Sequence, residues 1–391
     1  MDKRIKDLAG KYEAFCIGLR REFHRIPELP FVEFQTSERI EKELKRLGIP
    51  YRRCGGRTGW LATLGGKRAG RCILLRSDMD ALPVTEAAEC EFVSGNEGYM
   101  HACGHDAHMA MMLTVCRILK EMEGELNGTV KVLFQPAEEI AQGAKRCIEE
   151  GCLEGVDSAF SLHVWADPKI PSGIWSCEAG PRMSATGRFE ITITGKGGHG
   201  STPQHGIDAA VVLAAVVNNL QSIVSRETDP LETAVVTCGK LEAGTDWNII
   251  ASSAKIIGTS RTFSREIHAA FPAMIARIAR ETAEAYRAES ECKFIDISDP
   301  VVNDPVLAEL CAGSAAKIIG KDRIRPFAKT MGGEDFCFYL RQVPGVQAFL
   351  GINDPGEEVF ANHHPEFHID ESVLVDGVAV TAQYAVDYLN A

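Results

Sequence analysis

Long apolar runs are missing from this chain of 391 residues, in which no stretch of 18 consecutive residues is apolar. We therefore expect no segment that spans a membrane. Basic residues are also in deficit, because 42 lysines and arginines stand against 54 aspartates and glutamates and give a formal net charge of -12. An acidic surface attracts neither nucleic acid nor an anionic membrane, so we expect neither as a partner. No apolar signal segment follows the charged residues 1–7, which predicts a cytoplasmic protein.

Several common catalytic motifs are absent as well. The sequence contains no GxSxG, no Walker-type phosphate loop and no HExxH, so it does not support a serine hydrolase, a nucleotide hydrolase or a zincin. Its 13 cysteines include no CxxC pair and no disulfide-framework spacing. Most of them, such as Cys72 and Cys238 in apolar strand-like runs, are expected to be reduced core residues.

The length and the hydrophobic content of 45% suit a globular protein with two domains. Apolar runs of strand length at 72–75, 129–134 and 159–164 alternate with helical patterns, including one from about 105 to 121. This alternation predicts an α/β domain with helices on the faces of a sheet.

The pattern changes near residue 183. Residues 188–194 alternate with period two, as in a strand with one exposed face. The following segments are predicted to be helix, strand, strand, helix and strand, and the order β-α-β-β-α-β is ferredoxin-like. We therefore predict that residues 183–297 form an α+β domain inserted into a first domain made of 1–182 and 298–391.

Metal-binding side chains are concentrated in residues 100–108, which hold three histidines, a cysteine and an aspartate before an apolar helical segment. Histidine and cysteine together favour a transition metal. Further candidates follow predicted strands, whose carboxyl ends form the ligand-binding edge of an α/β sheet. The residues expected to converge there are Cys103 and His105 at a helix start, and Asp78, Asp80, Glu138, Glu139 and His163 at strand ends.

Glu138 and Glu139 are adjacent carboxylates that point in different directions. One can therefore bind a metal ion while the other takes a proton from water during hydrolysis. One more imidazole can come from 362–368, where His363 and His364 cannot easily both contribute. His108 could join His105 from the next helical turn, but its position in an apolar helix favours packing or support.

Residues 195–200 match GxGxxG after a predicted strand. In a dinucleotide site the last glycine already lies in the following helix, whereas here residues 201–206 intervene before the helix. We therefore interpret the glycines as a loop that presents His199.

Motifs of one family occur in order along nearly the whole chain. They are FHRIPEL at 23–29, SDMDALP at 77–83, HACGHDAH at 101–108, FQPAEE at 134–139, GKGGHGSTP at 195–203, GTSRTF at 258–263 and GGEDF at 332–336. With them the chain resembles the aminoacylase and carboxypeptidase G-like metallopeptidases. The resemblance is to the amidohydrolase branch, which includes hippurate hydrolases and indole-acetyl-amino-acid hydrolases.

The resemblance implies a mixed-sheet catalytic domain with two divalent metal ions, expected to be Zn²⁺ or Mn²⁺, with Ni²⁺ or Co²⁺ as alternatives. It implies that Cys103 bridges the ions, that Glu138 is the general base and later the acid, and that Asp80 orients the site. The other implied ligands are His105, Glu139, His163 and His363. The motif His363-His364-Pro365 departs from the usual His-Ser-Pro or His-Asn-Pro, which leaves His364 as an alternative ligand.

The resemblance also implies that the inserted domain is a lid that forms a homodimer. His199 would then reach the site of the partner subunit and stabilise the oxyanion, with Asn248 and Arg261 near the substrate. Ser260 stands where an aliphatic residue is usual in this family's arginine motif.

The resulting hypothesis is hydrolysis of the amide bond of an N-acyl amino acid to a carboxylic acid and an amino acid. Glu138 would remove a proton from the attacking water and return it to the leaving amine. Arg261 would bind the substrate carboxylate with its planar guanidinium. A dipeptidase or carboxypeptidase with the same site, a metal-binding protein without turnover, and a dimeric scaffold with a structural metal remain alternatives.

Overall fold

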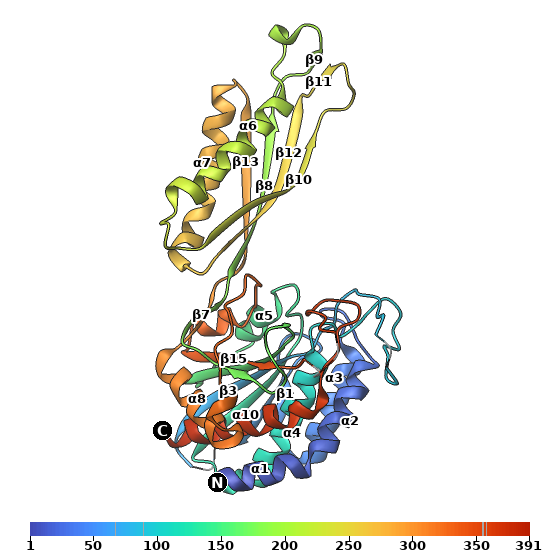
Figure 1. Ribbon diagram of the computed structural model, residues 1–391, viewed down its shortest axis with the longest axis vertical. Helices are drawn as coiled ribbons and strands as arrows, with labels where there is room; N and C mark the ends of the chain where they lie inside the picture. Colours follow the sequence, from blue (N-terminus) through green and yellow to red (C-terminus); the bar gives the residue numbers. More distant parts are fainter. Residues whose placement is uncertain (67, 89, 354–355, 357) are drawn as a thin grey trace. The chain divides into compact units, whose positions relative to one another are not determined.

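The computed structural model describes residues 1–66, 68–88, 90–353, 356 and 358–391 (Figure 1). The chain forms two compact units. The first consists of Met1–Gly180, Val302–Ala328 and Asp335–Ala391, and the second of Pro181–Val301 and Lys329–Glu334. The sequence-based division leaves residues 181–182, 298–301 and 329–334 in the first domain, whereas they belong to the second unit. Residues 329–334 join that unit through backbone hydrogen bonds, such as the one from Thr330 N–H to the carbonyl oxygen of Arg182 at 3.0 Å.

A mixed sheet runs through the first unit in the order β1-β2-β4-β3-β5-β15-β6. The inner strands β4, β3, β5 and β15 are parallel, whereas β2 and β6 pair antiparallel with their neighbours. The predicted α/β class with a mixed sheet is therefore confirmed. The bounds are β1 (Tyr51–Arg53), β2 (Trp60–Gly65), β3 (Arg71–Asp78), β4 (Gly128–Gln135), β5 (Ser158–Trp165), β6 (Trp175–Ser176) and β15 (Gly345–Gly351).

The helices of the first unit pack on this sheet and on one another. The apolar helix α4 is almost entirely buried, because it contacts β3 on one side and α2 and α10 on others. Helix α8 packs against α10 and β15. The bounds are α1 (Asp2–Lys11), α2 (Glu13–His24), α3 (Phe34–Leu47), α4 (His105–Glu121), α5 (Gly143–Glu149), α8 (Pro305–Ile319), α9 (Cys337–Leu340) and α10 (Leu374–Asn390).

The second unit contains an antiparallel sheet in the order β10-β12-β8-β13. Its elements follow one another as β8 (Ala185–Thr194), α6 (Ala209–Ser222), β10 (Ala234–Ala243), β12 (Ser253–Thr262), α7 (Arg265–Ala285) and β13 (Glu289–Ser298). This is the predicted β-α-β-β-α-β order. The period-two pattern of β8 buries Phe189, Ile191 and Ile193 against α6 and α7. The role of this unit as a lid or dimerisation domain stays a prediction.

One helical stretch of the second unit, Ala209–Glu227, is long and apolar enough to cross a membrane by length and composition alone. It consists of α6 and a π-helical turn, Ile223–Glu227. Val212, Val216 and Leu220 of α6 lie in the core of this unit, and core helices of globular domains pass the same test. The expectation of no membrane-spanning segment stays a prediction.

Candidate metal centre

Asp80 organises the backbone on which the candidate site is built. It follows the carboxyl end of β3, where Asp78 lies opposite Gln135 of the parallel strand β4. The Asp80 carboxylate accepts hydrogen bonds from the backbone N–H groups of Glu138 (2.9 Å) and Glu139 (3.0 Å). Its carbonyl oxygen accepts another from Nδ1 of His105 (2.8 Å). One residue therefore fixes the positions of the predicted base and of two predicted ligands.

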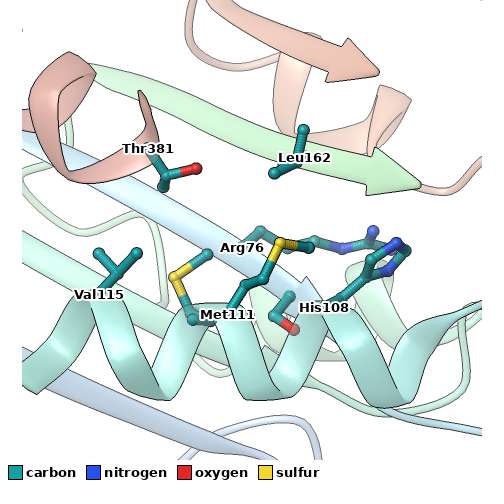
Figure 2. A pocket seen from close by; sticks show the side chains of 8 residues that line it. Arg76, His108, Met111, Val115, Leu162 and Thr381 are labelled. Carbon is teal, nitrogen blue, oxygen red and sulfur yellow. The ribbon is translucent and has the colours of Figure 1, made fainter. Parts of the chain in front are cut away.

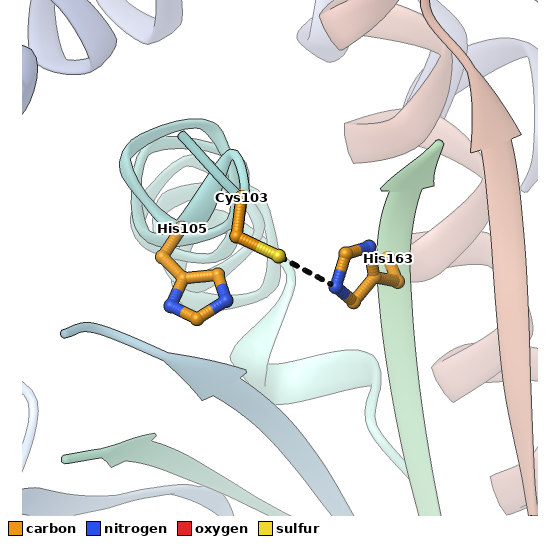
Figure 3. A group of neighbouring side chains, drawn as sticks. All are labelled: Cys103, His105 and His163. Carbon is orange, nitrogen blue, oxygen red and sulfur yellow. Dashed lines mark hydrogen bonds between the residues drawn. The ribbon is translucent and has the colours of Figure 1, made fainter. Parts of the chain in front are cut away.

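The start of α4 approaches β5 closely at Gly104, whose φ of 84° lies in the left-handed region. A Cβ atom at this position would meet Cγ2 of Val164 at 2.3 Å, so the approach requires glycine. As a result, Sγ of Cys103 lies 3.6 Å from Nε2 of His163 on β5. Figure 3 shows Cys103 and His105 at the start of α4, with the Cys103 sulfur facing His163.

His163 and His363 both present a ring nitrogen to the Cys103 sulfur. Nδ1 of His163 donates to the carbonyl oxygen of Val164 at 2.6 Å, which leaves the lone pair on Nε2. Nε2 of His363 lies 3.3 Å from Sγ of Cys103 and 3.6 Å from Oε2 of Glu139. Burial lowers the pKa of both imidazoles, so both favour the neutral form that binds metal ions.

His364, the alternative ligand, has different neighbours. Its ring stacks on Phe360 with the centroids 4.7 Å apart, and its Nδ1 accepts a hydrogen bond from the N–H of Glu366 at 3.1 Å. The N–H of His363 donates instead to the carbonyl oxygen of Ala102 at 2.7 Å. The φ of His363 is 73°, and in this left-handed conformation its ring reaches Cys103. The geometry therefore brings His363 to Cys103 and Glu139.

Two groups of three residues share Cys103, and each could hold one ion. They are Cys103, His105 and His163, and Cys103, Glu139 and His363, with the ligand atoms of each group within 4.8 Å of one another. Nε2 of His105 and Oε1 of Glu139 are buried, lie 3.8 Å apart, and have no hydrogen-bond partner among the described residues. These two atoms belong to a set of sulfur, imidazole and carboxylate donors, and such a set fits divalent transition-metal ions.

The charges of the site also fit a bound cation. Burial raises the pKa of the Cys103 thiol well above its usual range. It raises the pKa of Glu139 to about 7, against the opposing effect of His105 and with added repulsion from Asp80. Burial disfavours the charge of His105, but Asp78 and Asp80 outweigh it and raise the pKa. A metal ion would take the place of these protons as the compensating positive charge.

A buried charge network beside the site was missed by the sequence analysis. Arg76 on β3 donates to Oδ2 of Asp78 (2.5 Å) and to Oδ1 of Asp335 (2.8 Å). Oδ1 of Asp78 accepts a hydrogen bond from Nδ1 of His108 (2.6 Å), and Nε2 of His108 accepts one from the N–H of Val164 (2.9 Å). His108 therefore supports β5 next to His163. The available signal was an arginine in an apolar strand, because a buried arginine requires a partner.

A cavity of about 10 Å³ adjoins this network and is lined by Arg76, His108, Met111, Val115 and Leu162, among others. Figure 2 shows the Arg76 guanidinium beside the His108 ring, with the methionine and valine side chains of α4 farther along the cavity. A volume of this size holds one water molecule at most. A substrate therefore cannot reach the metal centre through it.

The remaining predicted site residues, His199, Asn248 and Arg261, belong to the second unit. His199 is exposed and pairs with Ile249, the residue after Asn248, where β9 (Gly198–His199) meets β11 (Ile249–Ile250). Arg261 is half-buried near the far end of β12, whose first residue is Ser253. At about 3.3 Å per residue, Arg261 lies roughly 25 Å along the strand from Ser253. The loop that carries His199 starts at the Ser253 end, where the N–H of Gly195 donates to the carbonyl oxygen of Ser252 at 2.9 Å. One copy of the unit therefore cannot bring His199 and Arg261 to the same small molecule.

A mixed α/β sheet with metal-ligand residues at the carboxyl ends of its strands is typical of metallopeptidases and related hydrolases. The chain belongs to peptidase family M20/M25/M40, whose sequence pattern matches residues 74–387. The family resemblance inferred from the motifs is thereby confirmed, and the protein is a hydrolase of this family.

The chain is similar over nearly its whole length to several known proteins. It is 38% identical over 375 residues to the N-acetylcysteine deacetylase of Bacillus subtilis (strain 168), covering 95% of this chain and 96% of the relative. It is 38% identical over 380 residues to the IAA-amino acid hydrolase ILR1-like 4 of Arabidopsis thaliana, covering 96% and 86%. The crystal structure of the YXEP protein of Bacillus subtilis, described as a dinuclear metal binding peptidase from M20 family, matches with a TM-score of 0.86 at 34% identity. The match covers 97% of this chain and 99% of that one.

Proposed function

We propose that this protein is a metal-dependent amidohydrolase that cleaves N-acyl amino acids into a carboxylic acid and an amino acid. The observation that carries the proposal is the pair of ligand groups that share Cys103. The substrate class is supported by the relatives named N-acetylcysteine deacetylase and IAA-amino acid hydrolase, each 38% identical to this chain.

We assign two ions to the site, with Cys103 as the bridge. The other ligands in this proposal are His105, Glu139, His163 and His363. Bound divalent ions would polarise the scissile carbonyl and make a water molecule acidic near neutral pH. Zn²⁺ or Mn²⁺ suits this donor set, and Ni²⁺ or Co²⁺ is the alternative. The dinuclear description of the YXEP protein supports the count.

Glu138 is the residue that we assign to proton transfer. Its backbone N–H is held by Asp80 at 2.9 Å, and the residue is only 9% exposed. A carboxylate oxygen of Glu138, a carboxylate oxygen of Glu139 and a ring nitrogen of His105 lie within 4.8 Å of one another. From there it would take a proton from the attacking water and return it to the leaving nitrogen.

A homodimer would complete the site in this proposal. Because His199 and Arg261 cannot meet one substrate from the same copy, we assign His199 to the partner's site as the oxyanion donor. Arg261 would bind the substrate carboxylate, and Asn248 would lie near the substrate. The uncharged helix α6, with Val211 51% exposed, offers a surface suited to a second copy.

Metal analysis and a substrate panel test the proposal. We expect about two ions per chain and faster hydrolysis of N-acetyl- and N-benzoyl-amino acids than of dipeptides. The reverse order of rates would favour the dipeptidase or carboxypeptidase alternative. Glu138→Gln should abolish turnover while the ions stay bound, and activity within about tenfold of the wild type would remove Glu138 from this role.

Mixing two inactive variants tests the role of His199 in the partner's site. A heterodimer of Glu138→Gln and His199→Ala chains contains one site with both groups intact only if His199 acts on the partner. Random mixing should then restore about a quarter of the wild-type activity. No recovery in verified heterodimers would assign His199 to its own subunit's site.

A further inference from the structure

Three cysteines outside the metal centre bring their thiols together inside the first unit. Cys54 follows β1, Cys147 lies on α5, and Cys152 lies in the turn after α5. All three are buried and free of disulfides. The Cys54 thiol donates to the carbonyl oxygen of Cys147 at 3.5 Å, and the backbone N–H of Cys152 donates to the same carbonyl oxygen at 3.1 Å. We call these three residues the thiol cluster.

The loop that follows Cys54 packs against Pro136, which lies two residues before Glu138. Gly55 has a φ of 94°, and a Cβ atom there would lie 2.8 Å from Sγ of Cys147 and 2.7 Å from Cδ of Pro136. The same loop is fixed by Glu150, whose carboxylate accepts the N–H of Gly55 at 2.8 Å. These contacts hold Cys54 beside Cys147, and only glycine fits at position 55.

Neighbouring groups make Cys54 the most acidic thiol of the cluster. Hydrogen bonds from Cys147 and Cys152 lower the pKa of Cys54, and the positive charge of Arg52 acts in the same direction. Burial raises the pKa of Cys147. The hydrogen bond to Cys54, together with burial, raises the pKa of Cys152. A thiolate beside two protonated thiols is the arrangement from which disulfides form.

A metal ion is the other ligand that three thiols could take. Three thiolates around one divalent ion would leave a net negative charge in a buried site, which costs free energy unless it is compensated. A disulfide carries no charge, so burial does not oppose its formation. The observations therefore favour oxidation over metal binding.

We propose that Cys54 forms a disulfide with Cys147 or Cys152 when the protein meets a peroxide, and that the thiol cluster is an oxidation site separate from the metal centre. The Cys54 sulfur attacks one oxygen of hydrogen peroxide, the O–O bond breaks, and a sulfenic acid and water form. The second thiol then attacks the Cys54 sulfur, and the hydroxyl group leaves with the thiol proton as water. The two sulfurs lose two electrons, which reduce the peroxide.

Peptide mapping of the full chain tests this proposal. The protein is exposed to graded hydrogen peroxide, its remaining thiols are alkylated in denaturant, and the peptides are identified by mass spectrometry. We expect peptides that join Cys54 to Cys147 or Cys152. Cys177 and Cys311 form the matched control, because both are also buried, the Cys177 thiol donates to the carbonyl oxygen of Ala308 on the helix of Cys311 at 3.7 Å, and burial raises the pKa of Cys311. Oxidation of this control pair before the thiol cluster would overturn the proposal.

Substitutions separate the roles within the thiol cluster. Cys54→Ser should eliminate every disulfide of the cluster at the same dose, whereas Cys147→Ser should leave the disulfide between Cys54 and Cys152. Cys116→Ser, which alters a buried thiol of α4, should change nothing in the cluster. A disulfide between Cys147 and Cys152 in the Cys54→Ser protein would show that Cys54 is not the reacting thiol. If Cys54→Ser does not fold, Cys54→Ala replaces it, and the wild-type map alone still decides whether the disulfide forms.

Discussion

Replacing Asp335 with alanine should destabilise the first unit by several kcal/mol. The Asp335 carboxylate is fully buried. It accepts hydrogen bonds from the Arg76 guanidinium at 2.8 Å, from Nε2 of Gln135 at 2.9 Å and from the N–H of Ala144 at 2.9 Å. The substitution leaves the guanidinium of Arg76 paired with the Asp78 carboxylate at 2.5 Å.

The magnitude follows from these lost interactions. Removing one partner of a buried ion pair costs about 3–5 kcal/mol, and an unsatisfied buried N–H at Ala144 costs about 1–3 kcal/mol. Because both losses arise at one site they do not simply add, and we expect about 4 kcal/mol for Asp335→Ala. Asp335→Asn keeps the shape and one acceptor oxygen, so it should cost about 2 kcal/mol.

Urea unfolding followed by tryptophan fluorescence measures these changes. Trp60, Trp165 and Trp175 lie in the first unit, and Trp60 and Trp175 are buried there. Trp247 of the second unit is 91% exposed and should respond little. Lys45→Met is the control, because it removes an exposed ion pair with Glu41 and should leave the urea midpoint unchanged. A loss below about 1 kcal/mol for Asp335→Ala would refute the argument, since it would mean that Arg76 does not depend on this carboxylate.

Three further predictions concern pH, metal content and backbone conformation. Burial, with repulsion from Asp80, raises the pKa of Glu33 from 4.5 to about 7. The contribution of protonated Glu33 to the free energy of unfolding is therefore complete below pH 4.5 and is lost as the pH rises through 7. Glu33→Gln should therefore reduce the loss of unfolding free energy between pH 5 and pH 8 by up to ~3 kcal/mol, and equal slopes for the two proteins would contradict this. Cys103→Ala should lower the metal content from about two ions to one or fewer, whereas Cys103→Asp should retain them; elemental analysis that finds full occupancy in Cys103→Ala would exclude the bridge. Gly104→Ala should cost about 2 kcal/mol or more by thermal unfolding, and Gly124→Ala, where a Cβ meets nothing within 4 Å, is its control.

The sequence was sufficient to predict which segments bring the candidate ligand residues to one edge of the sheet. Asp80 and Glu139 follow strands, and Cys103 precedes a helix, so the rule that strands end at one edge of an α/β sheet needed only the order of the elements. The observed register confirms that order for the strand ends, because Asp78 lies opposite Gln135. The second sheet was likewise predictable, since the alternation along β8 indicates its buried face.

The buried network could not be predicted in the same way. Arg76 and Asp335 are 259 residues apart, and no local periodicity indicates which acid a buried arginine will meet. The choice between His363 and His364 was also beyond the sequence, because it depends on the φ of 73° at His363. Either side chain has the chemistry of a ligand, and only the backbone conformation distinguishes them.

Left-handed backbone conformations recur where the site needs a sharp turn. Gly104, Ala137 and His363 have φ values of 84°, 57° and 73°, and for the two residues with side chains this costs about 1–2 kcal/mol each. Both are held by hydrogen bonds: the N–H of Ala137 donates to Glu33 at 3.1 Å, and the N–H of His363 donates to Ala102 at 2.7 Å. An extended backbone at Ala137 would carry the side chain of the next residue, Glu138, away from Cys103. An extended backbone at His363 would carry its own ring away from Cys103. The strain is therefore tolerated because the surrounding fold fixes it, and the fold thereby determines which neighbouring side chain enters the metal centre.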